Sequence, residues 1–325
     1  MLLHRIAKRL GWLAVLVGAI SAAQDYPSKA ITMVVPFAAG GPTDTVGRLI
    51  AQAMGTTLGQ QIIVENAGGA GGTLGAGRVA RADADGYTIL LHHIGQATSA
   101  TLYRKLPYRP ADGFEPIGLI TDVPMTLVAR KDFPADDLKG LLAYVKANKD
   151  KVTLANAGVG SASHLCGLLF MSAIDTALTT VPYKGTGPAM NDLLGGQVDL
   201  LCDQTTNTTG QIKGGKIKVY GVTAKTRVPA LPEVPTLGEA GMPGFEIAVW
   251  HGLYAPKNTP KEVIGKLAGA LQAALKDQNV IQRFAELGTA PVSPERATPE
   301  ALAAHLKAEI ERWAPIIQKA GVYAD

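Results

Sequence analysis

Short apolar runs rich in Val and Ile alternate along this chain with stretches in which apolar residues recur every three or four positions. The runs end at Gly, Pro or Asn, and such alternation is typical of strands followed by helices in an α/β protein. In the first part of the chain it predicts strands over 31–37, 62–64 and 87–91, and helices that begin at Pro42 and run over 73–81.

The same alternation continues in a second series that begins near residue 125. Its strands are expected near 125–129, 152–155, 178–183, 198–202 and 217–222. Its helices are expected over about 136–148 and 161–172, and from Pro188 and near Thr206. A second compact α/β unit therefore follows the first.

A proline-rich connector, residues 227–244, ends the second series and allows at most one short helix, near 236–240. A strand near 245–254 and two or three helices follow. One face of the last helix is apolar, which indicates a core-facing helix; its residues are Leu302, Leu306, Ile310, Trp313 and Ile317. This tail is too small for a sheet domain of its own, so we expect it to pack back on the first series.

These elements predict an α/β protein of two βαβ lobes with a ligand cleft between them. Residues 24–123 and 246–325 are expected to form lobe 1, and residues 124–245 to form lobe 2. The chain then crosses between the lobes twice, and two crossings predict a hinge.

The first 23 residues have the composition of a secretory signal peptide. Basic residues precede an apolar run from Leu10 to Ile20, and the small residues 21–23 follow it. The run is about half of the ~20 residues that a membrane span needs. We therefore expect 1–23 to be removed and the mature protein to be soluble in the periplasm.

Removal of this segment changes the charge. It takes three of the 31 Lys and Arg and none of the 27 Asp and Glu, which leaves a net charge of about +1. Without a long basic run, and with few aromatic residues, a nucleic-acid partner is not expected. The two cysteines, Cys166 and Cys202, either form a bridge in an oxidising compartment or remain free buried thiols.

Three strand-to-helix turns, over 36–44, 157–164 and 182–188, place small residues between an apolar strand and a helix start. Glycines let a ligand approach the backbone, and a helix N-terminus offers unpaired N–H groups and partial positive charge. Such turns line the crevice at the carboxyl ends of strands, so each is a potential carboxylate cradle. The alternative is that these residues only cap helices.

A secreted serine hydrolase is the alternative function. Ser161 or Ser163 would act with the neighbouring His164. Neither serine has the G-x-S-x-G flanks of a nucleophile elbow, and a serine that caps its own helix explains Ser161. His164 either donates to an anion or packs.

Nucleotide and metal sites have weaker support. The glycine-rich run 68–77 extends into a predicted helix and does not open at a strand exit, which argues against a dinucleotide. His92 and His93 are adjacent and would point apart on a strand, as satisfied or surface side chains. His164 and Cys166 lack partners at ligand spacing, so no metal and no cofactor are expected.

The chain resembles the Bug family, the extracytoplasmic receptors associated with tripartite tricarboxylate transporters. The motifs that carry this resemblance occur in the same order along the whole mature length, over 34–44, 64–66, 85–88, 160–165, 181–189, 192–199 and 231–236. Within the family, Cys166, Cys202 and the segment 202–209 are similar to the branch called BugD. That likeness implies aspartate or a similar acidic compound as ligand.

The resemblance implies a type II periplasmic binding protein fold whose two lobes close around one ligand. In lobe 1, a turn would hold one carboxylate largely through ordered waters; it comprises Phe37, Ala38, Ala39, Gly41, Thr43 and Asp44. In lobe 2, backbone N–H and hydroxyl groups would bind the other carboxylate; they belong to Gly160, Ser161, Ala162, Ser163, Tyr183 and Gly187.

Neither cradle contains an arginine, so the ligand's charge would be met by dipoles. A ligand ammonium would need an acidic or carbonyl partner. Asp203 is the first candidate and Asp44 the second, unless either caps a helix or binds its neighbour's backbone instead. Gln96, with Thr98 and Ser99, could line the remaining wall. We expect a monomer that binds a small carboxylate and delivers it to membrane transporter subunits or a sensor.

Overall fold

The structure is a computed structural model that describes residues 26–324. The expected signal peptide, 1–23, lies outside the described residues and stays a prediction. Within residues 26–324, no helix is both long and apolar enough to cross a membrane.

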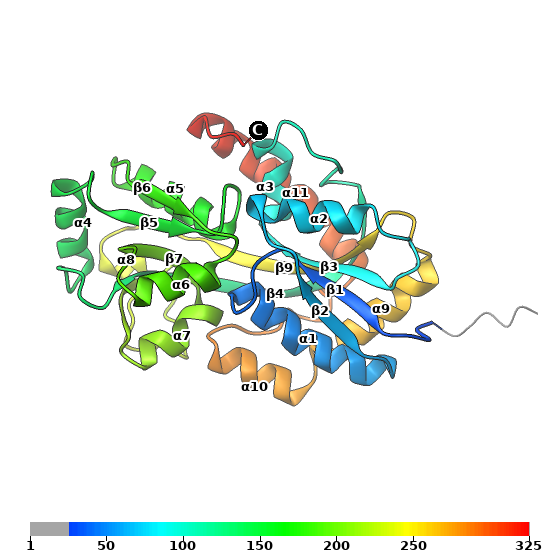
Figure 1. Ribbon diagram of the computed structural model, residues 1–325. Coiled ribbons are helices and arrows are strands. Elements are labelled where there is room, and N and C mark those ends of the chain that lie inside the picture. The colour runs from blue at the N-terminus through cyan, green and yellow to red at the C-terminus, as the bar shows by residue number, and fades with distance from the viewer. Residues whose placement is uncertain (1–25, 325) are drawn as a thin grey trace, which may run out of the picture.

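In the described part of the chain, one nine-stranded sheet runs from end to end, and helices cover its faces (Figure 1). At one end, the strand order is β2-β1-β3-β9-β4. The bounds are Ile31–Val35 for β1, Ile62–Asn66 for β2, Thr88–His93 for β3, Phe114–Arg130 for β4 and Ala248–Pro256 for β9. The helices of this part are α1 (Pro42–Leu58), the 3₁₀ helix η1 (Ala70–Gly72), α2 (Thr73–Ala80), α3 (Gly95–Leu102), α9 (Lys261–Ala274), α10 (Gln278–Glu286) and α11 (Pro299–Ala320).

At the other end, β4 continues into the order β4-β7-β5-β6, and β8 pairs with the other edge of β4. The strands are β5 (Thr153–Asn156), β6 (Thr179–Pro182), β7 (Leu200–Gln204) and β8 (Ile217–Val222). The helices are α4 (Leu138–Ala147), α5 (Ala162–Ala173), α6 (Thr186–Leu194), α7 (Thr205–Lys213) and α8 (Leu237–Ala240).

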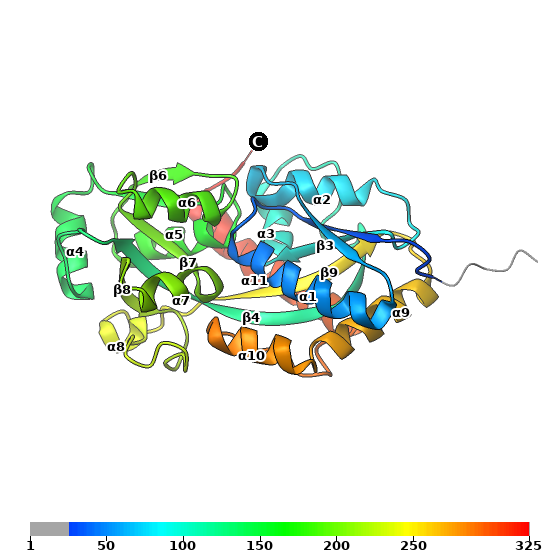
Figure 2. The same ribbon diagram turned by 60° about the horizontal axis from the view of Figure 1, so that its bottom comes forward.

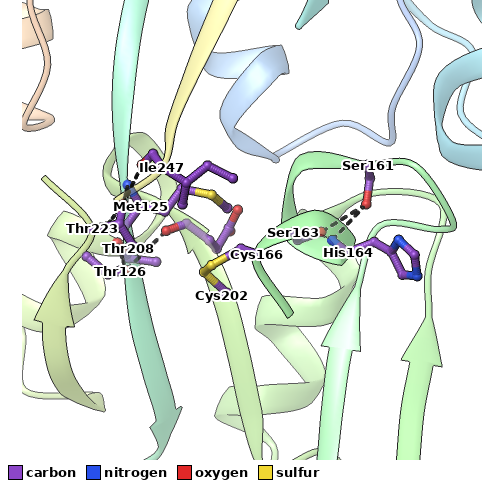
Figure 3. Close-up of a disulfide and its surroundings, with 11 residues drawn as sticks. Met125, Thr126, Ser161, Ser163, His164, Cys166, Cys202, Thr208, Thr223 and Ile247 are labelled. Atoms are coloured by element: carbon purple, nitrogen blue, oxygen red, sulfur yellow. Dashed lines mark hydrogen bonds between the residues drawn. A yellow bond between two sulfur atoms is a disulfide. The ribbon is translucent and has the colours of Figure 1, made fainter. Parts of the chain in front are cut away.

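The long strand β4 joins the two ends, as Figure 2 shows. Its first part pairs with β9 as far as Pro124, and from Met125 onward it pairs with β7 and β8. The chain crosses again between β8 and β9. There, Thr223 Oγ1 donates to Ile247 O at 2.6 Å, and Met125 N donates to Thr223 Oγ1 at 2.9 Å, so that buried hydrogen bonds tie the two crossings together (Figure 3).

The C-terminal helices pack against the N-terminal part, as expected. α9 contacts α1, and α11 contacts α3 and β4. Four of the five residues predicted to face the core from α11 are buried and the fifth, Ile310, is partly buried against them. The short helix after the proline-rich connector is also present, as α8.

The sequence pattern does not predict two elements. The first half of β4, 114–124, contains Pro116, Gly118 and Pro124, and its register with β9 shifts twice. The helix α3 has mainly small and polar residues and therefore lacks an apolar stripe, although nearly all of it is buried. Both elements depend on tertiary packing that no local pattern reports.

Candidate functional site

A small cavity lies where five strand-to-helix turns meet, those that follow β1, β3, β5, β6 and β7. The space open to the centre of a water molecule is about 10 Å³, enough for about one water. It is lined by Phe37, Gly41, Pro42, Thr43, His93, Ala157, Ser161, Ala162, Ser163, Thr186, Asp203 and Gln204. These residues come from both ends of the sheet, and none of them is Lys or Arg.

The turn between β1 and α1 contributes a helix N-terminus without a side-chain cap. Gly41 is the N-cap in an extended conformation, and Pro42 occupies the first helical position. Pro42 has no N–H, and Thr43 is buried at the cavity wall. The first turn of α1 therefore directs its backbone dipole toward this space.

Asp44 is engaged within this turn. Its carboxylate accepts from Gly40 N at 3.0 Å, from Arg48 Nε at 3.0 Å and from Asn66 Nδ2 at 2.9 Å. Burial is the largest single influence and raises the pKa of Asp44. The hydrogen bonds from Arg48, Gly40 and Asn66 together outweigh it and hold the pKa below its ordinary value. Asp44 is thus a stable anion that orders the turn.

The turn between β5 and α5 supplies the second helix N-terminus. Ser161 is the N-cap, and its Oγ accepts from His164 N at 3.3 Å. Ser163 Oγ accepts from Ala157 N at 2.9 Å and lies 3.1 Å from Ser161 Oγ. Through these hydrogen bonds, the two hydroxyl groups help to order the turn (Figure 3). Both serines are buried and line the cavity.

The His164 ring is not arranged as a catalytic base for either serine. Its Nδ1 accepts from Gly160 N at 3.3 Å, while the Ser161 oxygen accepts from the His164 backbone. Burial lowers the pKa of His164 to about 4. The ring therefore stays neutral and supports the turn, which is the packing alternative for this residue.

The end of β7 places two acceptors at the cavity. Asp203 is buried, and its Oδ2 accepts from Asn207 Nδ2 at 2.6 Å. Burial raises the pKa of Asp203 to about 6, although hydrogen bonds from Asn207, Gln204 and Thr186 act in the opposite direction. The neighbouring Gln204 is also buried, and its Oε1 has no hydrogen-bond partner among residues 26–324. A ligand donor would satisfy both groups.

Several predicted residues lie beside the cavity wall and do not line it. Ala38 N donates to Lys184 O at 2.9 Å, and a Cβ on Gly187 would lie 2.8 Å from Ala39 O. The β1–α1 turn therefore packs closely against the start of α6. The Tyr183 hydroxyl donates to Asp192 Oδ2 at 2.6 Å.

Three further predicted residues, Gln96, Thr98 and Ser99, lie in α3 just after the end of β3. Gln96 Nε2 donates to Pro110 O at 3.1 Å, and Thr98 Oγ1 donates to Gly160 O at 3.1 Å. Thr98 thereby links α3 to the β5–α5 turn. Ser99 Oγ donates to Gln96 O at 3.0 Å within α3.

The expected orientation of His92 and His93 is wrong. Both are buried and their ring centroids are 5.2 Å apart, and within the described part of the chain His92 Nε2 has no hydrogen-bond partner. They occupy the end of β3, where Ile94 turns into α3 with helical dihedrals, so strand alternation ends there. Among residues 26–324, no group of three or more His, Cys, Asp or Glu could hold a metal ion.

Five lining residues were not named individually: Pro42, His93, Ala157, Thr186 and Gln204. Pro42, Ala157 and Thr186 lie within the three turns predicted as carboxylate cradles, whereas His93 and Gln204 lie outside them. Each is a direct or near neighbour of a predicted residue, at the end of a strand or the start of a helix. The placement of turns at strand ends could therefore have found them.

A two-lobed fold with helix N-termini facing an inter-lobe cavity defines a solute-binding receptor. The chain belongs to the family described as tripartite tricarboxylate transporter family receptor, whose model matches residues 46–322. This is a family of periplasmic substrate-binding receptors and not of enzymes.

Relatives cover nearly the whole chain. A protein of Agrobacterium vitis, the UPF0065 protein in the TAR-I ttuE-ttuC' intergenic region, is 56% identical over 93% of this chain and 88% of its own length. BugT of Bordetella pertussis is 35% identical over 92% of this chain and 91% of its own length.

Solved structures agree with the fold. The periplasmic binding protein BugD has a TM-score of 0.90 and 55% identity, covering 92% of this chain and all of that one. MatC of Rhodopseudomonas palustris, with bound malate, has a TM-score of 0.87 and 44% identity over 90% of this chain and all of its own. Rpa4515 of R. palustris, with adipate, has a TM-score of 0.87 and 34% identity over 92% of this chain and 99% of its own.

Proposed function

We propose that this receptor captures a small dicarboxylate or an acidic amino acid such as aspartate between its lobes. It acts as a monomer and delivers the ligand to a tripartite tricarboxylate-type transporter or to a sensor. The observation that carries the proposal is the pairing of two helix N-termini with two buried acceptors around one cavity. The malate and adipate in the similar structures support a carboxylate ligand.

The helix termini supply the attraction for carboxylates. No Lys or Arg is among the residues that line the cavity, so a ligand anion meets backbone N–H groups and hydroxyls. Each helix end carries a partial positive charge of roughly half a unit. Two such ends, on α1 and α5, favour a ligand with two acidic groups.

Asp203 distinguishes the two ligand classes. A ligand ammonium beside this buried carboxylate would pair with the anion and with the free oxygen of Gln204. A ligand with a hydroxyl in that position would donate a hydrogen bond to the same groups. Aspartate is favoured over a hydroxy acid because its ammonium also offsets the buried negative charge of Asp203.

Ligand entry requires the lobes to separate, because the present space holds about one water. We propose that residues 24–123 and 246–325 move as one lobe and residues 124–245 as the other. The change of β4 partners between Pro124 and Met125 supports this boundary, as does the hydrogen bond from Ile247 N to Thr223 O. Closure then brings the β1–α1 turn against the start of α6.

Calorimetric titration of the purified mature protein tests this function. The panel is L-aspartate, L-malate, adipate, glutamine and glucose, and native mass spectrometry first identifies any ligand that copurifies. We expect binding of at least one dicarboxylate and none of glucose. Binding of glucose or glutamine, without binding of any of the carboxylates L-aspartate, L-malate and adipate, would overturn the proposal.

A further inference from the structure

We propose that His93 is a ligand-binding residue that donates a hydrogen bond from Nε2 to one ligand carboxylate and thereby fixes the orientation of the ligand in the cleft. This inference rests on the proposed function and assigns to the ligand site a residue that the sequence pattern did not place there. His93 ends β3, is 3% exposed and lines the inter-lobe cavity together with Thr43 and Ser161.

The hydrogen bonding of the ring determines which nitrogen carries the proton. His93 Nδ1 accepts from Gly95 N at 2.9 Å. A nitrogen that accepts an N–H bond carries no proton, so the neutral ring is protonated on Nε2. Burial, with His92 and His251 nearby, holds the pKa of His93 well below its ordinary value. His93 therefore has a donor and no second acceptor to offer.

Aromatic neighbours hold the ring in place. Phe37 stacks on it with a centroid distance of 4.5 Å and an interplanar angle of 22°. His92 and His251 meet it edge-on at 5.2 Å and 5.9 Å. A Cβ on Gly95 would lie 3.1 Å from His93 Cε1, so the backbone also closes against the ring. A donor fixed in this way loses little conformational freedom on binding.

The opposite character of the groups from the two ends of the sheet gives the site a direction. His93 belongs to β3 of the N-terminal part, whereas Asp203 and Gln204 end β7 and supply acceptors. A carboxylate is favoured beside the imidazole N–H and repelled by the Asp203 carboxylate. An ammonium or hydroxyl is favoured at the acceptors. A ligand that carries both groups would therefore bind in one orientation.

Substitution of His93 tests the donor directly. In His93→Gln, the amide nitrogen can occupy much the same position as Nε2, whereas His93→Phe keeps the aromatic packing and removes the donor. His305→Phe is the matched control, because His305 packs on Trp250 from α11 and does not line the cavity. Calorimetry uses L-aspartate and L-malate as probes, and circular dichroism establishes that each variant is folded.

We expect His93→Phe to weaken binding by about 10- to 100-fold, the usual effect of losing a hydrogen bond to a charged group. His93→Gln should recover part of this loss, and His305→Phe should bind like the wild type. Equal affinity of His93→Phe and wild type would overturn the role of His93 and leave the proposed function intact. Failure of wild type to bind any carboxylate would instead overturn both.

Nitrogen-15 NMR of the wild-type protein provides a test that needs no variant. The expected spectrum shows His93 protonated on Nε2 across neutral pH, with a shift of that nitrogen when either probe is added. Protonation on Nδ1, or an Nε2 resonance that saturating ligand does not move, would overturn the proposal.

Discussion

Cys166 and Cys202 form a disulfide that joins the second turn of α5 to β7 (Figure 3). Cys166 follows the lining residue Ser163 by three positions, and Cys202 immediately precedes Asp203. The bond therefore connects the helix that offers N–H groups to the strand that offers acceptors. Of the two alternatives for these cysteines, the bridge is the one the structure contains.

Removing the disulfide by Cys166→Ala with Cys202→Ala should lower both stability and affinity. The bond closes a loop of 36 residues, for which chain entropy predicts a loss of about 3–4 kcal/mol in the free energy of unfolding. Urea denaturation measures this loss. Titration with L-aspartate should show weaker binding, because α5 and β7 are no longer held together. Unchanged affinity in the folded double variant would show that the disulfide is not needed to hold the ligand site in place.

Asp203→Asn should change which ligands bind. At pH 7.5, the loss of the carboxylate should weaken L-aspartate by 30-fold or more, because its ammonium loses a buried partner. L-malate should be nearly unaffected, since an amide oxygen still accepts its hydroxyl. Asp199→Asn is the control for removal of a charge. Asp199 is partly exposed, and its Oδ1 accepts from Arg130 Nε at 2.8 Å. Equal losses for both ligands would contradict the assignment.

The same residue predicts a pH dependence of stability. The pKa of Asp203 is raised by burial from 3.8 to about 6 in the folded state, so the native protein binds more protons than the unfolded chain between these values. Its contribution to stability is therefore lost as the pH rises from about 4 to about 6. Relative to wild type, Asp203→Asn should gain up to about 3 kcal/mol across this window, measured by urea denaturation at several pH values. A constant difference between the two proteins would show that the carboxyl does not titrate there.

The sequence predicted the turns better than it predicted the directions of side chains. The small residues at the starts of α1 and α5 predicted ligand-binding turns. Four of the residues predicted in this way line the cavity: Gly41, Thr43, Ser161 and Ser163. Tyr183 differs, because its hydroxyl bonds Asp192 on the surface of α6 and no local pattern reports that choice.

Two other residues show a further limit of local patterns. Assigning His93 to the site depends on where β3 ends and on the hydrogen bond that its ring accepts from the backbone N–H of Gly95. Gln204 is adjacent to the predicted Asp203, but only the burial of its amide oxygen without a partner indicates a ligand. Tertiary contacts decide both cases.

Gly187→Ala should impede closure of the lobes. An added Cβ would lie 2.8 Å from Ala39 O and 3.0 Å from Gly41 N, and backbone atoms cannot move aside cheaply. We expect weaker ligand binding and a larger radius of gyration in the presence of ligand, measured by calorimetry and small-angle X-ray scattering. Gly210→Ala, in α7 with open space around it, is a matched helical control that should leave both quantities unchanged. Normal closure of Gly187→Ala would mean that this contact is not part of the closed state.

Glu309→Ala should destabilise the packing of α11. Glu309 is 7% exposed, and its Oε2 accepts from the indole Nε1 of both Trp250 and Trp313 at 3.1 Å. Truncation leaves two buried donors without partners, which costs about 2–5 kcal/mol in the free energy of unfolding. Glu311→Ala, an exposed position on the same helix, is the control and should change stability by less than about 0.5 kcal/mol. Tryptophan fluorescence during urea denaturation reports both the stability and the environment of the two indoles. Equal stability of the two variants would mean that water replaces the carboxylate at no cost.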